Sequence, residues 1–422
     1  MNDVNKKSII KLNNVTIRKA VKLWKENENG AIKLYGHISD WDTSDVTDMS
    51  KLFYYALDFD QNIGSWNVSN VTNMANMFEN ASSFNNGGNN SIGTWNVSNV
   101  TNMGNMFEGA ILFNQPIGPW NVGKVINMSE MFRFAHFFNQ PIGTWNVSNV
   151  KDISFMFFEA FRFNNGGSTN IKLWDVKNVI TMEYMFYKAY EFNQNIGTWN
   201  VSNVKNMKGM FYDAYEFDNA GNISIGSWNV SKVLNMKYMF YTSHKFNRDI
   251  GTWNVSNVIN MERMFEFAFQ FNNNGSKSIE SWNVSSVLSM ESIFEDAQLF
   301  NQNIGKWPIR IDCNIERMFY DCAIKKETFE GFLYGNKIAE YFQLDNPNEF
   351  LVWEPYTRWE RRKNAVMVFN SIFKMNINTN PFKSGKPLKS KKIDSEGSER
   401  NSILNTLHYL DDDIYKEIIY FI

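Results

Sequence analysis

Histidine and cysteine are the residues whose chemistry could most directly support catalysis or metal binding in this chain. Cys313 and Cys322 are nine residues apart, which is typical of neither a metal site nor a redox pair. No zinc-binding, phosphate-binding or nucleophile motif accompanies the histidines. We therefore expect a non-enzymatic protein with no cofactor, no catalytic residue and no metal site. The four histidines are scattered: His37, His136, His244 and His408.

Tryptophan supplies the strongest pattern, because it recurs at intervals of 25 or 29 residues. A fixed period of this length is typical of one short unit stacked many times, and such stacks usually bind other molecules along their surface. We call each unit a rung and number positions from its tryptophan, so that +13 is the thirteenth residue after it. The eleven rungs begin at Trp41, Trp66, Trp95, Trp120, Trp145, Trp174, Trp199, Trp228, Trp253, Trp282 and Trp307.

The residues of one rung predict its local structure. In the second rung, apolar residues occupy +8, +11, +12 and +15, which is the spacing of one face of a helix of two to three turns. The stretch from Ile63 to Val68 reads as a short strand. We therefore predict an α/β repeat solenoid with short parallel strands and short helices. Its structural core should include Trp66, Trp95, Trp120, Trp145, Trp174, Trp199, Trp228, Trp253 and Trp282.

Two further features recur with the rungs. Asparagine or aspartate occupies +19 in nearly every rung, and its side chain could bond the backbone of its own rung and the next. The four longer intervals each carry four extra residues rich in Gly, Asn and Ser, beginning at Asn85, Asn164, Asp218 and Asn272. We expect loops along one side of the rod, either as tolerated insertions or as decoration of a binding face.

An aromatic stripe is the main candidate for a functional surface. Positions +10, +13 and +16 lie opposite the core positions of the predicted helix, and they are polar in most rungs. In the rungs of Trp145, Trp174, Trp199 and Trp228 they are aromatic, with His244 at the last of them. We predict an exposed patch for partner binding or self-association, the alternative being packing between helices. Its residues are Phe155, Phe158, Phe161, Tyr184, Tyr187, Tyr190, Tyr212, Tyr215, Tyr238 and Tyr241.

The repeat resembles a known family. The segments WNVSNVTNMANMFENASSFN, FNQPIGTWNVSNV and YGHISDWDTSDVTDMSKLF resemble the BspA-like leucine-rich repeat family over residues 16–322. This resemblance implies a leucine-rich-repeat-like solenoid used for adhesion or protein recognition, without catalytic residues. The Asn-, Lys- and Ile-rich composition and the absence of a recognisable leader resemble giant-virus members of that family.

The ends of the chain differ from the repeats. Residues 1–37 should form a helical cap, with Thr16 as the N-cap of a helix at 16–24, followed by the solenoid at 38–325. Residues 326–375 are expected to be helical and residues 376–400 to be a flexible linker. Residues 401–422 contain an amphipathic helix, from Leu410 to Ile422, that loosely resembles the first helix of an F-box.

Composition narrows the choice of function. The formal net charge is −2, which gives no signal for nucleic acid, and no stretch is apolar enough to span a membrane. No secretory signal peptide is recognisable, and Asn-x-Ser/Thr triplets follow most core tryptophans, so we expect an intracellular or virion location. The leading hypothesis is a protein-protein interaction scaffold with protein partners. The alternatives are a substrate-recruiting adaptor for ubiquitin ligation and a surface adhesin.

Overall fold

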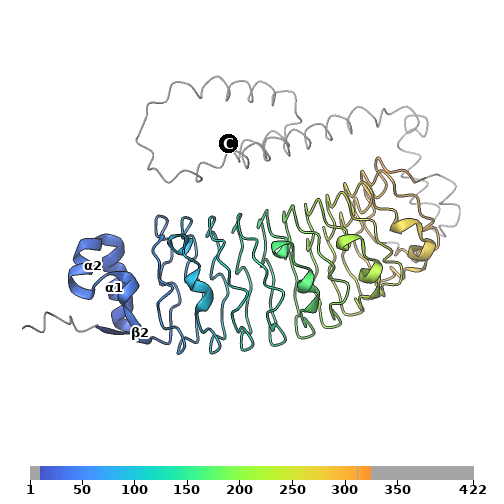
Figure 1. The fold of residues 1–422 in the computed structure, drawn as a ribbon. Helices are drawn as coiled ribbons and strands as arrows, with labels where there is room; N and C mark the ends of the chain where they lie inside the picture. Colours follow the sequence, from blue (N-terminus) through green and yellow to red (C-terminus); the bar gives the residue numbers. More distant parts are fainter. Residues whose placement is uncertain (1–9, 311, 325–422) are drawn as a thin grey trace, which may run out of the picture. The chain divides into compact units, whose positions relative to one another are not determined.

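The computed structural model describes residues 10–310 and 312–324. In them the repeats stack as successive rungs of a solenoid, and two helices cover its N-terminal end (Figure 1). The predicted repeat solenoid is thus confirmed, but the local structure within each rung differs from the prediction. The predictions for residues 326–375, 376–400 and 401–422 lie outside the described residues.

The N-terminal cap consists of β1 (Lys11–Asn13), α1 (Asn14–Glu26) and α2 (Glu28–Tyr35). The predicted N-cap was wrong by one turn. Asn13 caps α1 by accepting from the backbone N–H groups of Val15 and Thr16, and the Thr16 hydroxyl bonds back to the backbone N–H of Asn13. This reciprocal pairing satisfies donors that a helix start leaves unpaired. The helix buries one face against the first rung: Ile17, Ala20, Val21 and Trp24.

The cap continues the hydrogen-bonding pattern of the rungs. The short 3-10 helix η1 (Ile38–Asp40) leads into Trp41, and β2 (Asp42–Asp45) then pairs in parallel with β1. Beyond this pair, the Asn14 side chain accepts a hydrogen bond from the backbone N–H of Thr47 at 2.8 Å. The cap therefore supplies partners for a first rung that has no preceding rung.

Positions +8 to +15 form consecutive turns, so the predicted helices are wrong. Two residues in this stretch have left-handed backbone conformations in every rung, as at Asn76 (φ 58°) and Asn80 (φ 56°). Their N–H groups donate to carbonyl oxygens of the next rung, as from Asn76 to Gly104 at 2.9 Å. Burial at every third or fourth residue fits a helix and also fits these turns, which is why the apolar spacing was misleading.

Apart from β2, which begins directly after Trp41, the strand predicted around each tryptophan is also absent from the described rungs. The backbone N–H of Trp66 bonds to the carbonyl of Ile63 at 3.0 Å, which closes a turn. Parallel pairing between rungs instead occurs at +7, in single bridges such as Asn73 with Asn102. The indole of Trp66 donates at 2.8 Å to the carbonyl of Ile38, which lies three residues before the tryptophan of the preceding rung. Tryptophan therefore connects rungs through its side chain.

Aromatic rings fill the interior of the solenoid. The eleven repeat tryptophans are each between 2% and 4% exposed. Phenylalanines at +12 and +18 stack within a rung, as for Phe78 and Phe84 with ring centroids 3.9 Å apart. The +12 rings also stack from rung to rung, as for Phe78 and Phe107 at 5.5 Å. Removal of these rings from water is the main source of stability, because the free energy gained on burial is roughly proportional to the apolar area that leaves water.

Asparagine and aspartate at +19 form a continuous ladder of side-chain hydrogen bonds. Each side-chain oxygen accepts from the backbone N–H of the +19 residue in the next rung; the Asn139 oxygen, for example, accepts from Asn164 at 2.9 Å. Where an insertion follows, the same oxygen also accepts from a second N–H, that of Gly166 at 2.8 Å. The ladder runs through Asp60, Asn85, Asn114, Asn139, Asn164, Asn193, Asp218, Asn247, Asn272 and Asn301.

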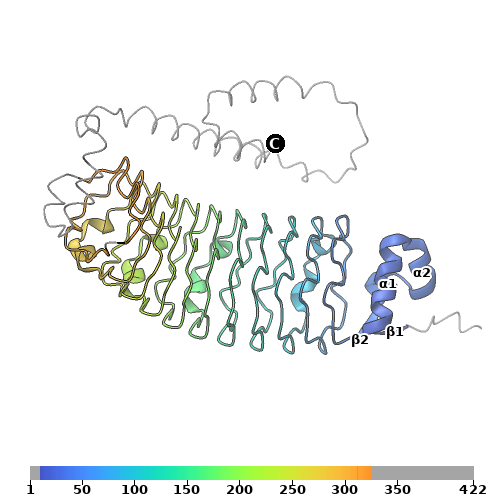
Figure 2. The ribbon, with the colours of Figure 1, turned by 180° about the vertical axis from the view of Figure 1, so that it is seen from behind.

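The four insertions form short 3-10 helices that recur along the stack (Figure 2). The second residue of each insertion is a fully buried asparagine, so these segments are not simple surface loops. Asn86, for example, accepts from the backbone N–H of Ile63 in the adjoining rung at 2.9 Å. The helices are η2 (Asn86–Gly88), η3 (Asn90–Thr94), η4 (Asn165–Gly167), η5 (Thr169–Leu173), η6 (Asn219–Gly221), η7 (Ile223–Ser227), η8 (Asn273–Gly275) and η9 (Lys277–Ser281).

The asparagine that follows most of the repeat tryptophans is exposed on the surface of the solenoid. Asn67, Asn96 and Asn146 are all exposed, and each accepts a hydrogen bond from the backbone N–H two residues later. They form local turns on the surface. A bulky group at these positions would not meet the core, so the triplets carry no argument about compartment.

Substitution of Asn139 should test the +19 ladder. Asn139→Ala leaves two backbone N–H groups without their acceptor, and we expect the free energy of unfolding to fall by about 1–3 kcal/mol per group. Asn139→Asp keeps the oxygen, as Asp60 and Asp218 do in other rungs, and should cost much less. Urea unfolding of both variants measures the difference. Equal losses in the two variants would show that the ladder contributes little.

Candidate functional site

Aromatic rings at +13 form a stack that crosses four consecutive rungs, here called the +13 ladder. Its members are Phe158, Tyr187, Tyr212 and Tyr241. Successive ring centroids are 4.1, 4.7 and 4.3 Å apart, and the ring planes are 6°, 28° and 19° from parallel. The rungs bring equivalent positions together because each is bonded in register to the next. Side chains 25 or 29 residues apart in sequence are therefore direct neighbours.

A second stack, the +16 ladder, is longer. Ring centroids from one member to the next are 4.3, 5.1, 4.9, 4.8 and 4.6 Å apart. The sequence prediction included the central members of this stack and missed both ends, although the same rung position would have identified them. The ladder consists of His136, Phe161, Tyr190, Tyr215, His244 and Phe269.

Position +10 is aromatic in only three of the four rungs, and the structure explains the gap. Phe155 contacts Tyr184 of the next rung at a centroid distance of 5.4 Å. In the following rung the position is Gly209, with φ at 57°. A Cβ atom on Gly209 would lie 2.1 Å from the Tyr184 ring. The absence of a side chain at Gly209 therefore allows the Tyr184 ring to lie over the next rung. In the rung after Gly209, position +10 is Tyr238, which contacts Tyr212 edge-on at a centroid distance of 5.7 Å.

The predicted stripe is contiguous, but its rings are half-buried rather than fully exposed. Phe161 is 4% exposed, and the other nine predicted residues are of intermediate exposure. Stacking covers the ring faces of the +13 and +16 ladders. Burial raises the pKa of the Tyr212 and Tyr241 hydroxyls, so both stay protonated. Packing between neighbours, the alternative to an exposed patch, therefore accounts for much of the ring surface.

An arginine lies at one end of the +13 ladder. The Arg133 guanidinium is 5.1 Å from the ring centroid of Phe158, close enough for a cation-π contact. Arg133 also pairs with Glu130 at 2.6 Å and with Glu108 at 3.3 Å. The charge is thus compensated on the side away from the rings, which lets Arg133 cover the last ring face of the ladder.

A buried carboxyl lies at the other end. Glu266 occupies +13 in the rung after Tyr241 and is 3% exposed. Burial raises its pKa to about 8, and the neighbouring carboxylate of Glu295 adds to the shift. Arg263, with its guanidinium 3.5 Å from the carboxyl, opposes the shift. The ladder therefore ends in a carboxyl that binds its proton more tightly than an exposed glutamate does.

The two histidines of the +16 ladder are neutral stacking partners. Burial lowers the pKa of both His136 and His244 to about 4. Each ring stacks on an aromatic neighbour, with His136 on Phe161 and His244 on Tyr215. Their role in the structure is that of flat aromatic rings. In the described residues, moreover, no three His, Cys, Asp or Glu side chains are grouped as metal ligands would be.

Glu266→Gln should reduce the pH dependence of stability. A carboxyl whose pKa rises from 4.5 to about 8 on folding stabilises the folded state fully below pH 4.5, and this contribution is lost as the pH rises to 8. The lost free energy is on the order of a few kcal/mol, at about 1.4 kcal/mol per pKa unit. Urea unfolding at pH 5 and pH 9 should show a smaller difference for the variant. The control is Glu216→Gln, which removes an exposed carboxylate paired with Lys245 and should leave that difference unchanged.

Comparison with known proteins identifies the repeat. A family model described as "Mycoplasma protein of unknown function, DUF285" matches residues 3–90, 86–169, 168–223 and 218–332. No curated protein and no solved structure matches the chain. No helix in the part of the chain that the structure describes is long and apolar enough to cross a membrane. Because the matched segments include every rung from Trp41 to Trp307, the chain belongs to the DUF285 repeat family.

Proposed function

We propose that this chain is a non-enzymatic scaffold that binds a protein partner through the aromatic face of its fifth to eighth rungs. The observation that carries the proposal is the concentration of tyrosine and phenylalanine at +10, +13 and +16 in these four consecutive rungs, which each have at least two of them. Asn76, Glu79 and Ser82 occupy the same positions in the second rung, so the fold itself does not require aromatic side chains there.

The chemistry of this face suits recognition of a protein surface. Tyrosine is enriched at the centres of protein interfaces because one ring combines a large apolar area with a hydroxyl. Stacking holds Tyr187, Tyr212 and Tyr241 in place before binding, so little side-chain entropy would be lost on association. Because the ring faces are already covered, the partner would contact ring edges and hydroxyl groups.

The resemblance to BspA-like leucine-rich repeat proteins supports the same class of function. Leucine-rich-repeat-like solenoids present one residue per rung at equivalent positions, which builds an extended recognition surface. The rungs described above share that property through their register, although their turns and single bridges differ from the short strands and helices that we predicted. Self-association through the aromatic face is the main alternative to a different partner.

Two sets of variants test the proposal. Tyr187→Phe, Tyr212→Phe and Tyr241→Phe together keep the stack and remove its hydroxyl groups, so the melting temperature should stay close to that of the wild type. The same residues changed to Ser should lose both binding and stability, because stacked rings each contribute about 0.5–1.5 kcal/mol beyond their burial. Affinity capture with mass spectrometry identifies partners, and the purified complex is then measured directly.

The control replaces exposed apolar side chains elsewhere, Leu112→Ser with Leu299→Ser. We expect at least a tenfold loss of affinity for the Phe variant and none for the control. Sedimentation velocity on the wild-type chain separates self-association from binding to another protein. If the partner bound the Phe and Ser variants as well as the wild type, the aromatic face would have only a structural role.

A further inference from the structure

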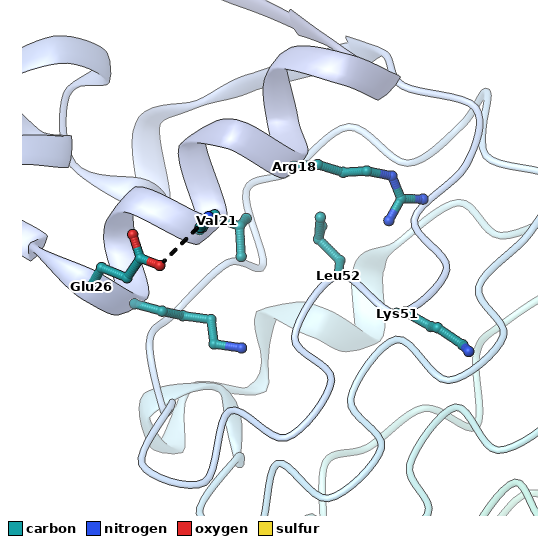
Figure 3. Close-up of a pocket in the computed structure, with 7 residues that line it drawn as sticks. Arg18, Val21, Glu26, Lys51 and Leu52 are labelled. Atoms are coloured by element: carbon teal, nitrogen blue, oxygen red, sulfur yellow. Dashed lines mark ion pairs between the residues drawn. The ribbon is translucent and has the colours of Figure 1, made fainter.

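A pocket of about 240 Å³ lies between helix α1 and the first rung. Its lining residues are more than 100 positions before the aromatic face in the sequence. Its apolar part is formed by Val21 and Leu52, which are 2% and 5% exposed. Figure 3 shows the Leu52 side chain directed into the space beneath α1, with the charged ends of Arg18 and Lys51 on the same side of the pocket. The remaining lining residues are also charged: Lys22, Lys25 and Glu26.

Two of the four cations are held in place by the first rung. The Arg18 guanidinium donates to the backbone carbonyl of Ser50 at 2.6 Å and to the Asp48 carboxylate at 3.1 Å. The Lys25 ammonium donates to the backbone carbonyl of Tyr54 at 3.1 Å. These contacts come from the segment that also carries Lys51, so α1 and the first rung together determine where the positive charges lie.

The positive charge in the pocket is only partly compensated. Asp48 pairs with Arg18, and Glu26 pairs with Lys22 at 3.8 Å. Lys25 contacts a carbonyl oxygen, and Lys51 lies 5.6 Å from the ring centroid of Tyr54. Within residues 10–310 and 312–324, neither of these two lysines forms an ion pair with a carboxylate. The chain as a whole has a formal net charge of −2, so this cluster is not a consequence of a basic protein.

We infer that this pocket binds a compact oxyanion with more than one negative charge, such as a phosphate group. Lys25 and Lys51 supply ammonium groups that form no ion pair in the described residues. Arg18 supplies a guanidinium already oriented by the Ser50 carbonyl and the Asp48 carboxylate, and a guanidinium is the donor type that suits phosphate oxygens. The site is open to solvent, so binding should weaken with added salt. The inference is independent of the aromatic face and goes beyond its proposed role.

Titration of the full-length chain with inorganic phosphate tests the site. At low ionic strength, isothermal titration calorimetry should detect binding of phosphate and of sulfate, and weaker binding of singly charged acetate. Lys25→Gln combined with Lys51→Gln should weaken phosphate binding by about tenfold or more, equivalent to about 1.4 kcal/mol. Both lysines are exposed, so the variant should keep the wild-type circular dichroism spectrum and melting temperature.

The matched control changes Lys19 and Lys205 to Gln, because both are exposed and lie outside the pocket. It alters the net charge by the same amount and should bind phosphate as the wild type does. Three results would overturn the inference: no phosphate binding at low salt, equal loss in the two double variants, or acetate bound as tightly as phosphate. A phosphorylated peptide and its unphosphorylated form, titrated next, distinguish a free anion from one carried by a protein.

Discussion

The backbone hydrogen bonds that join each rung to the next are the constraint on which the rest of the structure depends. In the rungs of Trp41 to Trp282, the N–H groups at +10, +12 and +14 donate to the following rung, as from Phe78 to the Met106 carbonyl at 2.9 Å. This pattern requires left-handed residues at +10 and +14, which cost free energy for most side chains. The compensation comes from the core, since the same register stacks the +12 phenylalanines from rung to rung, as for Phe78 on Phe107, and stacks tryptophans in pairs, as for Trp95 on Trp120.

Once the register is established, each side-chain position becomes a line of neighbours. A position occupied by Asn or Asp becomes a hydrogen-bond ladder, as at +19, and a position occupied by aromatic residues becomes a stack, as at +13 and +16. The residues at the two ends of such a row of equivalent positions then have different neighbours from those in its middle. Arg133 and Glu266 occupy +13 at the two ends of the aromatic run. Arg133 lies over the Phe158 ring and pairs with two carboxylates, whereas Glu266 is buried beside Arg263 and near Glu295.

The sequence predicted the features that repeat in every rung, but it did not predict the backbone conformation within a rung. The tryptophan interval and the +19 asparagines predicted the stack and its polar ladder, because each rung repeats the same requirement. The turns at Asn76 and Asn80 were mistaken for a helix, since the spacing of buried residues does not report the sign of φ. Asparagine, which tolerates the left-handed region better than most residues, occupies these positions in only a few rungs, so residue type gave little signal of the turns.

The candidate site was predictable to a similar degree. Equivalent positions in neighbouring rungs had to meet, so the contiguity of the aromatic residues followed from the repeat alone. Their half-burial did not, because it depends on turns that direct +13 and +16 partly over the next rung. The raised pKa of Glu266 also required the structure, since it reflects burial of the carboxyl and the approach of Glu295 from the next rung.

Gly209 has a consequence for how such a surface can change over generations. A side chain at this one position would collide with the Tyr184 ring, so two adjoining copies of the repeat cannot drift independently there. Duplication of the rung that contains Gly209 would add a second glycine at +10, with no Tyr184 ring above it. Loss of that rung would instead place the Tyr184 ring beside the bulkier +10 residue of the rung that follows. A change in the number or order of rungs therefore changes which residue lies beside Tyr184, even when no residue within a rung is substituted.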